Sequence, residues 1–273
     1  MKISARTIGL FLLLTLGACS NGKIPLEYNF EEGDGTRYRW TIDSTTSVNS
    51  TSEESVTTTN MIVDVHEQVS QNKGEDPILT ITLAPSRLRQ GNRSMNIPKP
   101  MAVKYQLNKQ GEIVKPVTDE LAPGAASAVQ LGATLVRSRV ALPAEPVGIG
   151  DEWDTPFVLD GDLGNIKLEG QGKLLGFELK GKRKLARIET TRSGDIVTHE
   201  QQGGVPVQLQ GTSSSTALSS LDVDKGVLYA TSSRLISDFD IASEESGKLI
   251  GTMRVTLNSK LELAPSRPTR AIR

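Results

Sequence analysis

Cys19 is the one cysteine in the 273-residue chain, and its neighbours give it a specific chemistry. It follows Leu16-Gly17-Ala18, which ends a short apolar run that begins after two basic residues. A positive end, an apolar run and small residues before the cleavage point are the layout of an export signal. A thiol directly after the small pair can be joined to diacylglycerol before cleavage, as in the bacterial lipobox. We therefore predict a signal peptide over residues 1–18 and an acylated Cys19 as the mature N-terminus.

Acylation of Cys19 predicts where the protein resides. The apolar run is too short to span a bilayer, which takes about 20 residues, whereas acyl chains contribute about 0.8 kcal/mol per buried CH₂. Residues 19–26 would then form the lipid anchor and tether. Ser20, in place of an aspartate, fits lipoproteins sent on to the outer membrane. We expect the bacterial cell envelope: the periplasmic face of the outer membrane in a two-membrane host, or otherwise the outer leaflet of the cell membrane.

Other residues that could do chemistry are poorly placed for it. Ser70 and Lys73 have S-x-x-K spacing but lie in a polar turn, whereas that motif needs a helix start. His66 lies on the polar side of an expected strand, and His199 lies next to a Gln-rich, Gly-rich turn. The turn 222–226 resembles part of a calcium loop, but its glycine comes one residue early and the terminal glutamate is missing. The sequence thus predicts a non-enzymatic protein with no catalytic residue, no metal site and no cofactor.

Composition narrows the classes of partner. The formal net charge is −1, which together with export argues against nucleic acid. Aromatic residues are 4% of the chain, so few side chains could stack on sugar rings in a carbohydrate-binding site. With one cysteine, the mature chain has no internal disulfide to hold it together. The expected partners are the membrane through acylated Cys19, a lipid or other apolar ligand, or an envelope protein.

Alternation of apolar and polar residues is the main structural signal. It is typical of strands with one buried face, and therefore of an antiparallel sheet. Gly-containing turns between the runs predict hairpins. The polar stretch 43–60 predicts two edge strands with a loop between them, and spacing of three and four over 125–140 predicts a helix. The alternating runs are centred on Trp40, Val63, Ile81, Tyr105, Val207 and Leu257.

A weak internal repeat predicts two related modules. Gly33-Asp34 precedes Trp40, and Gly150-Asp151 precedes Trp153, each just before an expected strand. We therefore predict the following division: a first β module over 27–118, a helical connector over 119–145, a second β module over 146–264 and a disordered tail over 265–273. The fold class expected is mainly β (α+β): a strongly curved antiparallel sheet or half-barrel, with one or a few short helices.

Four stretches carry a resemblance to a known family. The lipobox, "YNFEEGDGTRYRW", "LPAEPVGIGDEW" and "LDVDKGVLYATSSRL" are similar to a family of bacterial lipoproteins without an assigned activity. They are more distantly similar to the lipoprotein-carrier superfamily. That resemblance implies an open half-barrel with a few helices at its mouth and, in several members, a lipid in the cavity. It implies no binding residue in this chain.

Two hypotheses of function follow. The first is a lipoprotein that binds a lipid or other apolar ligand in a concave sheet, with Met253, Val255 and Leu257 as candidate ligand-binding residues. The alternative is a structural or envelope-assembly lipoprotein that offers its sheet to a protein partner. An enclosed apolar cavity would favour the first, and an exposed apolar patch over a closed core would favour the second.

Overall fold

The chain forms one large antiparallel sheet. The computed structural model describes residues 22–33, 35–50, 54–71, 76–117, 135, 139–161, 164–202 and 205–265. Within these residues there are thirteen strands and no helix is assigned as an element. The mainly β class is thus confirmed, whereas short helices are not shown. The predicted helix 125–140 lies outside the described residues except for Leu135, Arg139 and Val140, which are all buried.

Most of the strands are long. Seven of them run for 15 to 20 residues, which at about 3.3 Å per residue gives lengths of roughly 50–65 Å. The bounds are β1 Gly35–Ser50, β2 Glu54–Gln71, β3 Ile78–Gln90, β4 Arg93–Ser94, β5 Met101–Leu107, β6 Ile113–Val117, β7 Glu152–Asp154, β8 Phe157–Gly161, β9 Gly164–Lys180, β10 Arg183–Gln202, β11 Val205–Asp222, β12 Val227–Ser243 and β13 Leu249–Leu263.

The strand order unites the two halves of the chain in one sheet. It runs β6-β5-β3-β2-β1-β13-β12-β11-β10-β9-β7, with β4 beside β3 and β8 beside β9. The strands of each predicted module are contiguous, and the pairing of β1 with β13 joins them. The stretch 43–60 does form two strands, but the prediction that they are edge strands was wrong, because β1 and β2 lie in the middle of the sheet.

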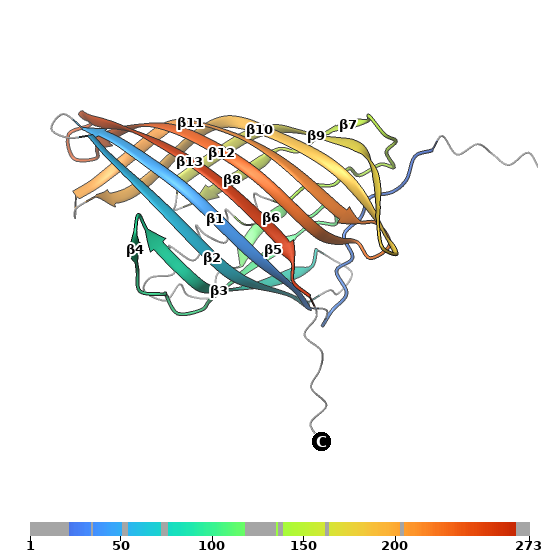
Figure 1. Ribbon diagram of the computed structural model, residues 1–273. Helices are drawn as coiled ribbons and strands as arrows, with labels where there is room; N and C mark the ends of the chain where they lie inside the picture. The colour runs from blue at the N-terminus through green and yellow to red at the C-terminus, as the bar shows by residue number, and fades with distance from the viewer. Residues whose placement is uncertain are drawn as a thin grey trace, which may run out of the picture.

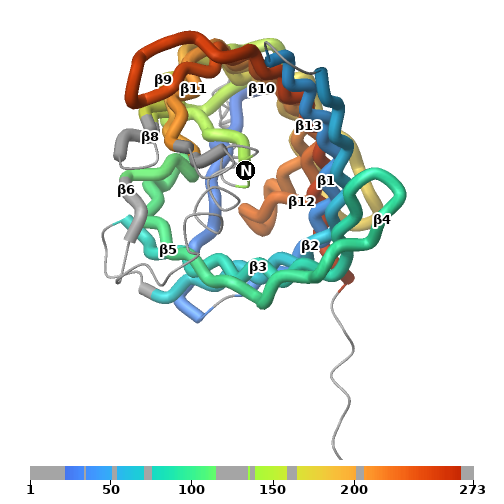
Figure 2. The backbone as a smooth tube through the Cα atoms, turned by 90° about the vertical axis from the view of Figure 1, so that its left-hand side faces the viewer, coloured from blue at the N-terminus to red at the C-terminus, as the bar shows by residue number. Residues whose placement is uncertain are grey.

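The sheet is strongly curved, so that it wraps around a central space (Figures 1 and 2). Curvature of this kind needs positions where neighbouring backbones come close. At Gly194 a Cβ would collide with the carbonyl oxygen of Lys167, and at Gly251 it would lie 2.6 Å from the carbonyl oxygen of Asn49. Because glycine has no Cβ, the long strands can bend at these positions without breaking their pairing.

The main hydrophobic core fills one end of this space, which we call the core end. Trp40, Leu261 and Ile188 are fully buried there, on the concave face of three different strands. Two segments outside the strands complete the core: Leu26 and Tyr28 of the N-terminal segment, and the stretch 140–147. The opposite end, where β1 ends at Ser50, we call the far end. It has a smaller cluster of Val207, Leu209 and Ile241.

The two edges of the sheet lie side by side (Figure 2). Ile113 of β6 packs against the cluster formed by Phe157, Leu168 and Ile196, which contains the edge strand β8. No backbone pairing joins β6 to β7 or β8 among the described residues. The sheet therefore remains open along this line, and the two edges meet through side chains.

Candidate functional site

The three residues predicted to bind a ligand lie on the concave face of β13. Met253, Val255 and Leu257 alternate along the strand with exposed Arg254 and Asn258, which face outward. They have the same orientation as Leu261, which is fully buried in the core. Unlike Leu261, each of the three is only partly buried. β13 thus passes from a packed core to a partly exposed apolar stripe on the same face.

Neighbouring strands extend this stripe into a patch. In the register of the sheet, Leu257 lies beside Leu235 of β12, and Met253 lies beside Phe239. On the other side, Met253 lies beside Val48 of β1. All the members are partly buried. We call this set the concave patch: Val48, Leu235, Phe239, Met253, Val255 and Leu257. The sequence indicated its β13 members through their alternation, but the members on β1 and β12 depend on strand register.

Hydroxyl side chains surround the concave patch. On β11 to β13, Ser237 donates to Ser213 (2.9 Å), Ser233 and Ser259 lie 2.9 Å apart, and Ser219 lies 2.5 Å from Thr231. On β1 and β2, Ser44, Thr46, Thr57 and Thr59 are partly exposed on the same face. The β11–β13 hydroxyls satisfy one another, which allows them to be buried. The concave face is therefore amphipathic, with aliphatic groups beside hydroxyl groups.

A buried ion pair holds the connector against the sheet. Arg139 Nη2 donates to Glu67 Oε2 at 2.5 Å, and each side chain is 4% exposed. Burial raises the pKa of Glu67, and the charge of Arg139 opposes that rise. Burial also raises the pKa of Tyr28 to about 12. The Tyr28 hydroxyl donates to the carbonyl oxygen of Val140 (2.9 Å). The ring of Tyr28 lies 5.4 Å below the Arg139 guanidinium. This cluster fixes residues 139–140 in the core.

Arg192 of β10 lies on the concave face between this cluster and the hydroxyl groups. Its Nε donates to the carbonyl oxygen of Thr155 (3.1 Å), and its Nη2 lies 3.5 Å from the carbonyl oxygen of Arg139. Burial lowers the pKa of the Arg192 guanidinium to about 10. Even so it remains charged at neutral pH. Arg192 therefore links the edge of the sheet to the connector.

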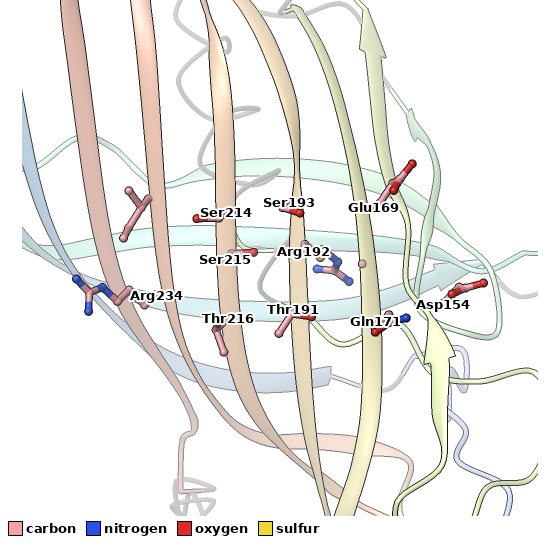
Figure 3. A pocket seen from close by; sticks show the side chains of 12 residues that line it. Asp154, Glu169, Gln171, Thr191, Arg192, Ser193, Ser214, Ser215, Thr216 and Arg234 are labelled. Carbon is pink, nitrogen blue, oxygen red and sulfur yellow. The ribbon is translucent and has the colours of Figure 1, made fainter.

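The outer face carries a polar hollow of about 550 Å³ across β9 to β12 (Figure 3). Its middle is formed by the exposed hydroxyl groups of Thr191, Ser193, Ser214 and Thr216. The hollow is bounded by Arg234 on one side and by acidic side chains, Glu169 and Asp154, on the other. These residues alternate with inward-facing ones, so the hollow lies on the face opposite the concave patch. It has no histidine or cysteine that could pair with a hydroxyl as a base or nucleophile.

The structure disperses the other residues that the sequence singled out. His66 lies on β2, whereas His199 on β10 lies 2.6 Å from Glu244. In the turn after β11, Asp222 accepts from the backbone N–H of Lys225 (3.2 Å) and from Arg183 (3.4 Å), as expected of a hairpin turn. Lys73 and Cys19 lie outside the described residues. Within the described part of the chain, no group of three or more acidic, histidine or cysteine side chains could hold a metal ion.

Among the residues that the structure describes, none belongs to a helix long and apolar enough to cross a bilayer.

Comparison with known proteins gives weak likenesses. No protein-family model and no curated protein matches the chain, so the resemblance to a lipoprotein family stays a prediction. A structure on lipid–protein interactions in lipovitellin is 11% identical with a TM-score of 0.46, over 90% of this chain and 27% of that one. DynF, from dynemicin biosynthesis in Micromonospora chersina, is 9% identical with a TM-score of 0.24, over 96% and 94%. The chain thus spans about a quarter of the lipovitellin chain, and neither alignment carries a functional argument.

Proposed function

We propose that this protein is a lipoprotein of the bacterial cell envelope that binds a lipid or other apolar ligand on the concave face of its sheet, without catalysing a reaction. The concave patch is the observation that carries the binding part of the proposal. Its aliphatic side chains continue the apolar stripe of the core but remain partly exposed, as on Val255 and Leu257. Covering such a surface with an apolar ligand is favourable, because it removes apolar area from water.

The size and chemistry of the concave patch suit a chain-like amphipathic ligand. Covering about 200 Å² of apolar surface would gain about 5 kcal/mol at 25 cal/mol per Å². The neighbouring hydroxyl groups of Ser44, Thr46 and Thr57 can donate to ester or headgroup oxygens. A long-chain fatty acid or a phospholipid presents both kinds of surface.

A bulky substitution on the concave patch tests this proposal. We expect a form lacking residues 1–22 to bind long-chain fatty acids or phospholipids in a displacement titration. Val255→Trp should weaken that binding at least tenfold, because the larger side chain occupies the space of the ligand. Asn258→Trp is the matched control, since it places the same side chain on the outer face of the same strand.

Binding that is equally strong in both variants would place the ligand elsewhere. Absence of binding in the unsubstituted protein, together with unchanged thermal stability when lipid is added, would contradict the lipid-binding proposal. Native mass spectrometry of the purified protein provides an independent measurement, because a retained lipid would appear as a defined mass increment.

Anchoring is tested separately through the proposed acylation site. Cys19→Ser removes the only thiol of the chain. We expect the variant to accumulate as unprocessed precursor and to incorporate no labelled fatty acid, because acylation precedes cleavage. Normal labelling of the Cys19→Ser chain would refute the lipoprotein assignment.

The sheet edges support an alternative function in envelope assembly. Val114 of β6 and Val158 of β8 are 50% and 60% exposed on strands that border the open line of the sheet. An edge strand with exposed apolar groups can pair with a strand of another protein. Photo-crosslinking from positions 114 and 158 in cells distinguishes this function, because it should then capture the same envelope protein at both edges, with no lipid bound.

A further inference from the structure

The turn between β9 and β10 gathers positive charge at the core end of the sheet. Lys180, Lys182, Arg183 and Lys184 fall within five residues that contain no acidic side chain. Gly181, with φ of 64°, allows a tight two-residue hairpin turn. Leu179, directly before the cations, is 78% exposed. The tip of this hairpin therefore combines basic groups with an exposed aliphatic side chain.

Arg183 takes part in the fold through an ion pair, whereas Lys180 and Lys184 lie against aromatic rings. Lys180 Nζ lies 4.9 Å from the ring centre of Tyr229, and Lys184 Nζ lies 4.5 Å from that of Phe177. Arg183 pairs with buried Asp222 at 3.4 Å. The three lysines of the turn form no ion pair with any other described residue. Their charges therefore remain available to an external anion.

The N-terminal segment leaves the molecule from the same end (Figure 1). Gly22 is the first described residue, and Lys23 pairs with Asp151 at 2.9 Å. The backbone N–H of Gly150 donates to Leu174 of β9, six residues before Lys180. Three residues of chain span at most about 10 Å, which limits the reach of a tether between position 19 and Gly22.

Charges of both signs lie around the basic turn at the core end. The exposed acids Glu27 and Asp224 are accompanied by the exposed bases Lys23 and Lys225. β13 also ends here, since Leu263 pairs with Tyr38 at the start of β1. The positive charge at this end is therefore concentrated in the turn itself, where four bases fall within residues 180–184.

We propose that the turn of residues 179–184, called here the basic tip, docks on the anionic phospholipid headgroups of the membrane that carries the acylated Cys19. This inference rests on the anchoring part of the proposed function. Lysine and arginine side chains near an anionic bilayer each strengthen binding about fivefold, and Leu179 enters the interface between headgroups and acyl chains. Docking through the basic tip directs the core end to the membrane and the far end away from it.

A fluorescent probe on the basic tip tests this orientation. The lipidated protein is reconstituted into phosphatidylcholine vesicles with or without phosphatidylglycerol. An environment-sensitive dye is placed on Leu179→Cys, which can be labelled selectively because Cys19 is acylated. Val56→Cys is the matched control, since it is 61% exposed and lies at the far end. We expect the dye at position 179 to report contact with lipid only in the phosphatidylglycerol vesicles, and the dye at position 56 to report water in both.

Removing the lysines tests the charge contribution. The background is the Leu179→Cys protein, and the triple variant adds Lys180→Gln, Lys182→Gln and Lys184→Gln. We expect this variant to reduce the ratio of docked to undocked protein on the order of 100-fold. Lys248→Gln is the control, because this exposed lysine lies at the far end. The unfolding temperature of each variant is measured alongside, so that a loss of docking by a folded protein is attributable to charge.

The outcomes separate the docking surface from the anchor. A dye at position 179 that reports water in phosphatidylglycerol vesicles, while Cys19 carries labelled fatty acid, would overturn the docking surface alone. Contact retained by the triple lysine variant would also overturn it. If Cys19 carries no fatty acid but the dye still contacts added phosphatidylglycerol vesicles, the anchor is wrong and the docking surface stands. Competition by free inorganic phosphate at the same charge concentration would indicate an adventitious anion site and overturn it.

Discussion

At the scale of single residues, the buried pair of Glu67 and Arg139 is the most specific contact in the core. It joins β2 to a residue 72 positions further along the chain. Removing two charges from water is costly, so a buried pair contributes little net stability compared with apolar residues of the same size. What the pair can provide is selectivity, because only one placement of the connector satisfies both charges. We infer that it fixes the position of residues 139–142 inside the curved sheet.

The ion pair predicts an asymmetric response to substitution. Arg139→Met should lower the free energy of unfolding by about 3–5 kcal/mol, because it leaves the Glu67 carboxylate buried without a partner. Adding Glu67→Gln should recover at least half of that loss, since the charge is then removed. Urea denaturation measures both values. A cost below about 1 kcal/mol for the single variant would show that water reaches Glu67 when Arg139 is absent.

At the scale of elements, alternation of residue type predicted the strands well. It could not predict which strands pair with each other, and therefore which of them lie in the middle of the sheet. The concave orientation of Trp40 and Leu257 follows from a period of two along each strand. The stretch 43–60 is rich in serine and threonine and therefore indicated edge strands. In the structure these residues lie in central strands. Ser44 and Thr46 have hydroxyl neighbours on β2 and aliphatic neighbours on β13. Pairing of β1 with β13, more than 200 residues apart, leaves no local signal.

The bends of the long strands give a prediction at this scale. Gly194→Val would place a Cβ against the carbonyl oxygen of Lys167 and within 3.0 Å of the Cα of Leu168. The pairing of β9 with β10 must then shift, and we expect a loss of about 1–3 kcal/mol in unfolding free energy. Ser193→Val is the matched control, because its side chain is exposed on the outer face. Equal thermal stability of the two variants would mean that the bend does not depend on glycine.

At the scale of the whole molecule, one continuous sheet connects all the features described. The core end is filled by Trp40, Tyr28 and the connector, whereas the concave patch continues the same face towards the far end. Since β1 and β13 pair along their length, the concave patch lies on the strands that join the two halves of the chain. A ligand that covers the concave patch would therefore stabilise both halves at once.

This arrangement predicts that ligand binding raises the unfolding temperature of the whole protein. A lipid at 100 times its dissociation constant adds about 2.7 kcal/mol of stability, which corresponds to an increase of roughly 5–10 °C for a domain of this size. Scanning calorimetry should show a single transition that moves upward, because the ligand contacts strands from both halves. The Val255→Trp protein, with binding at least tenfold weaker, should show at most about half of this increase, whereas Asn258→Trp should respond like the parent. A transition that splits in two when lipid is added would show that the halves unfold independently and that the concave patch does not couple them.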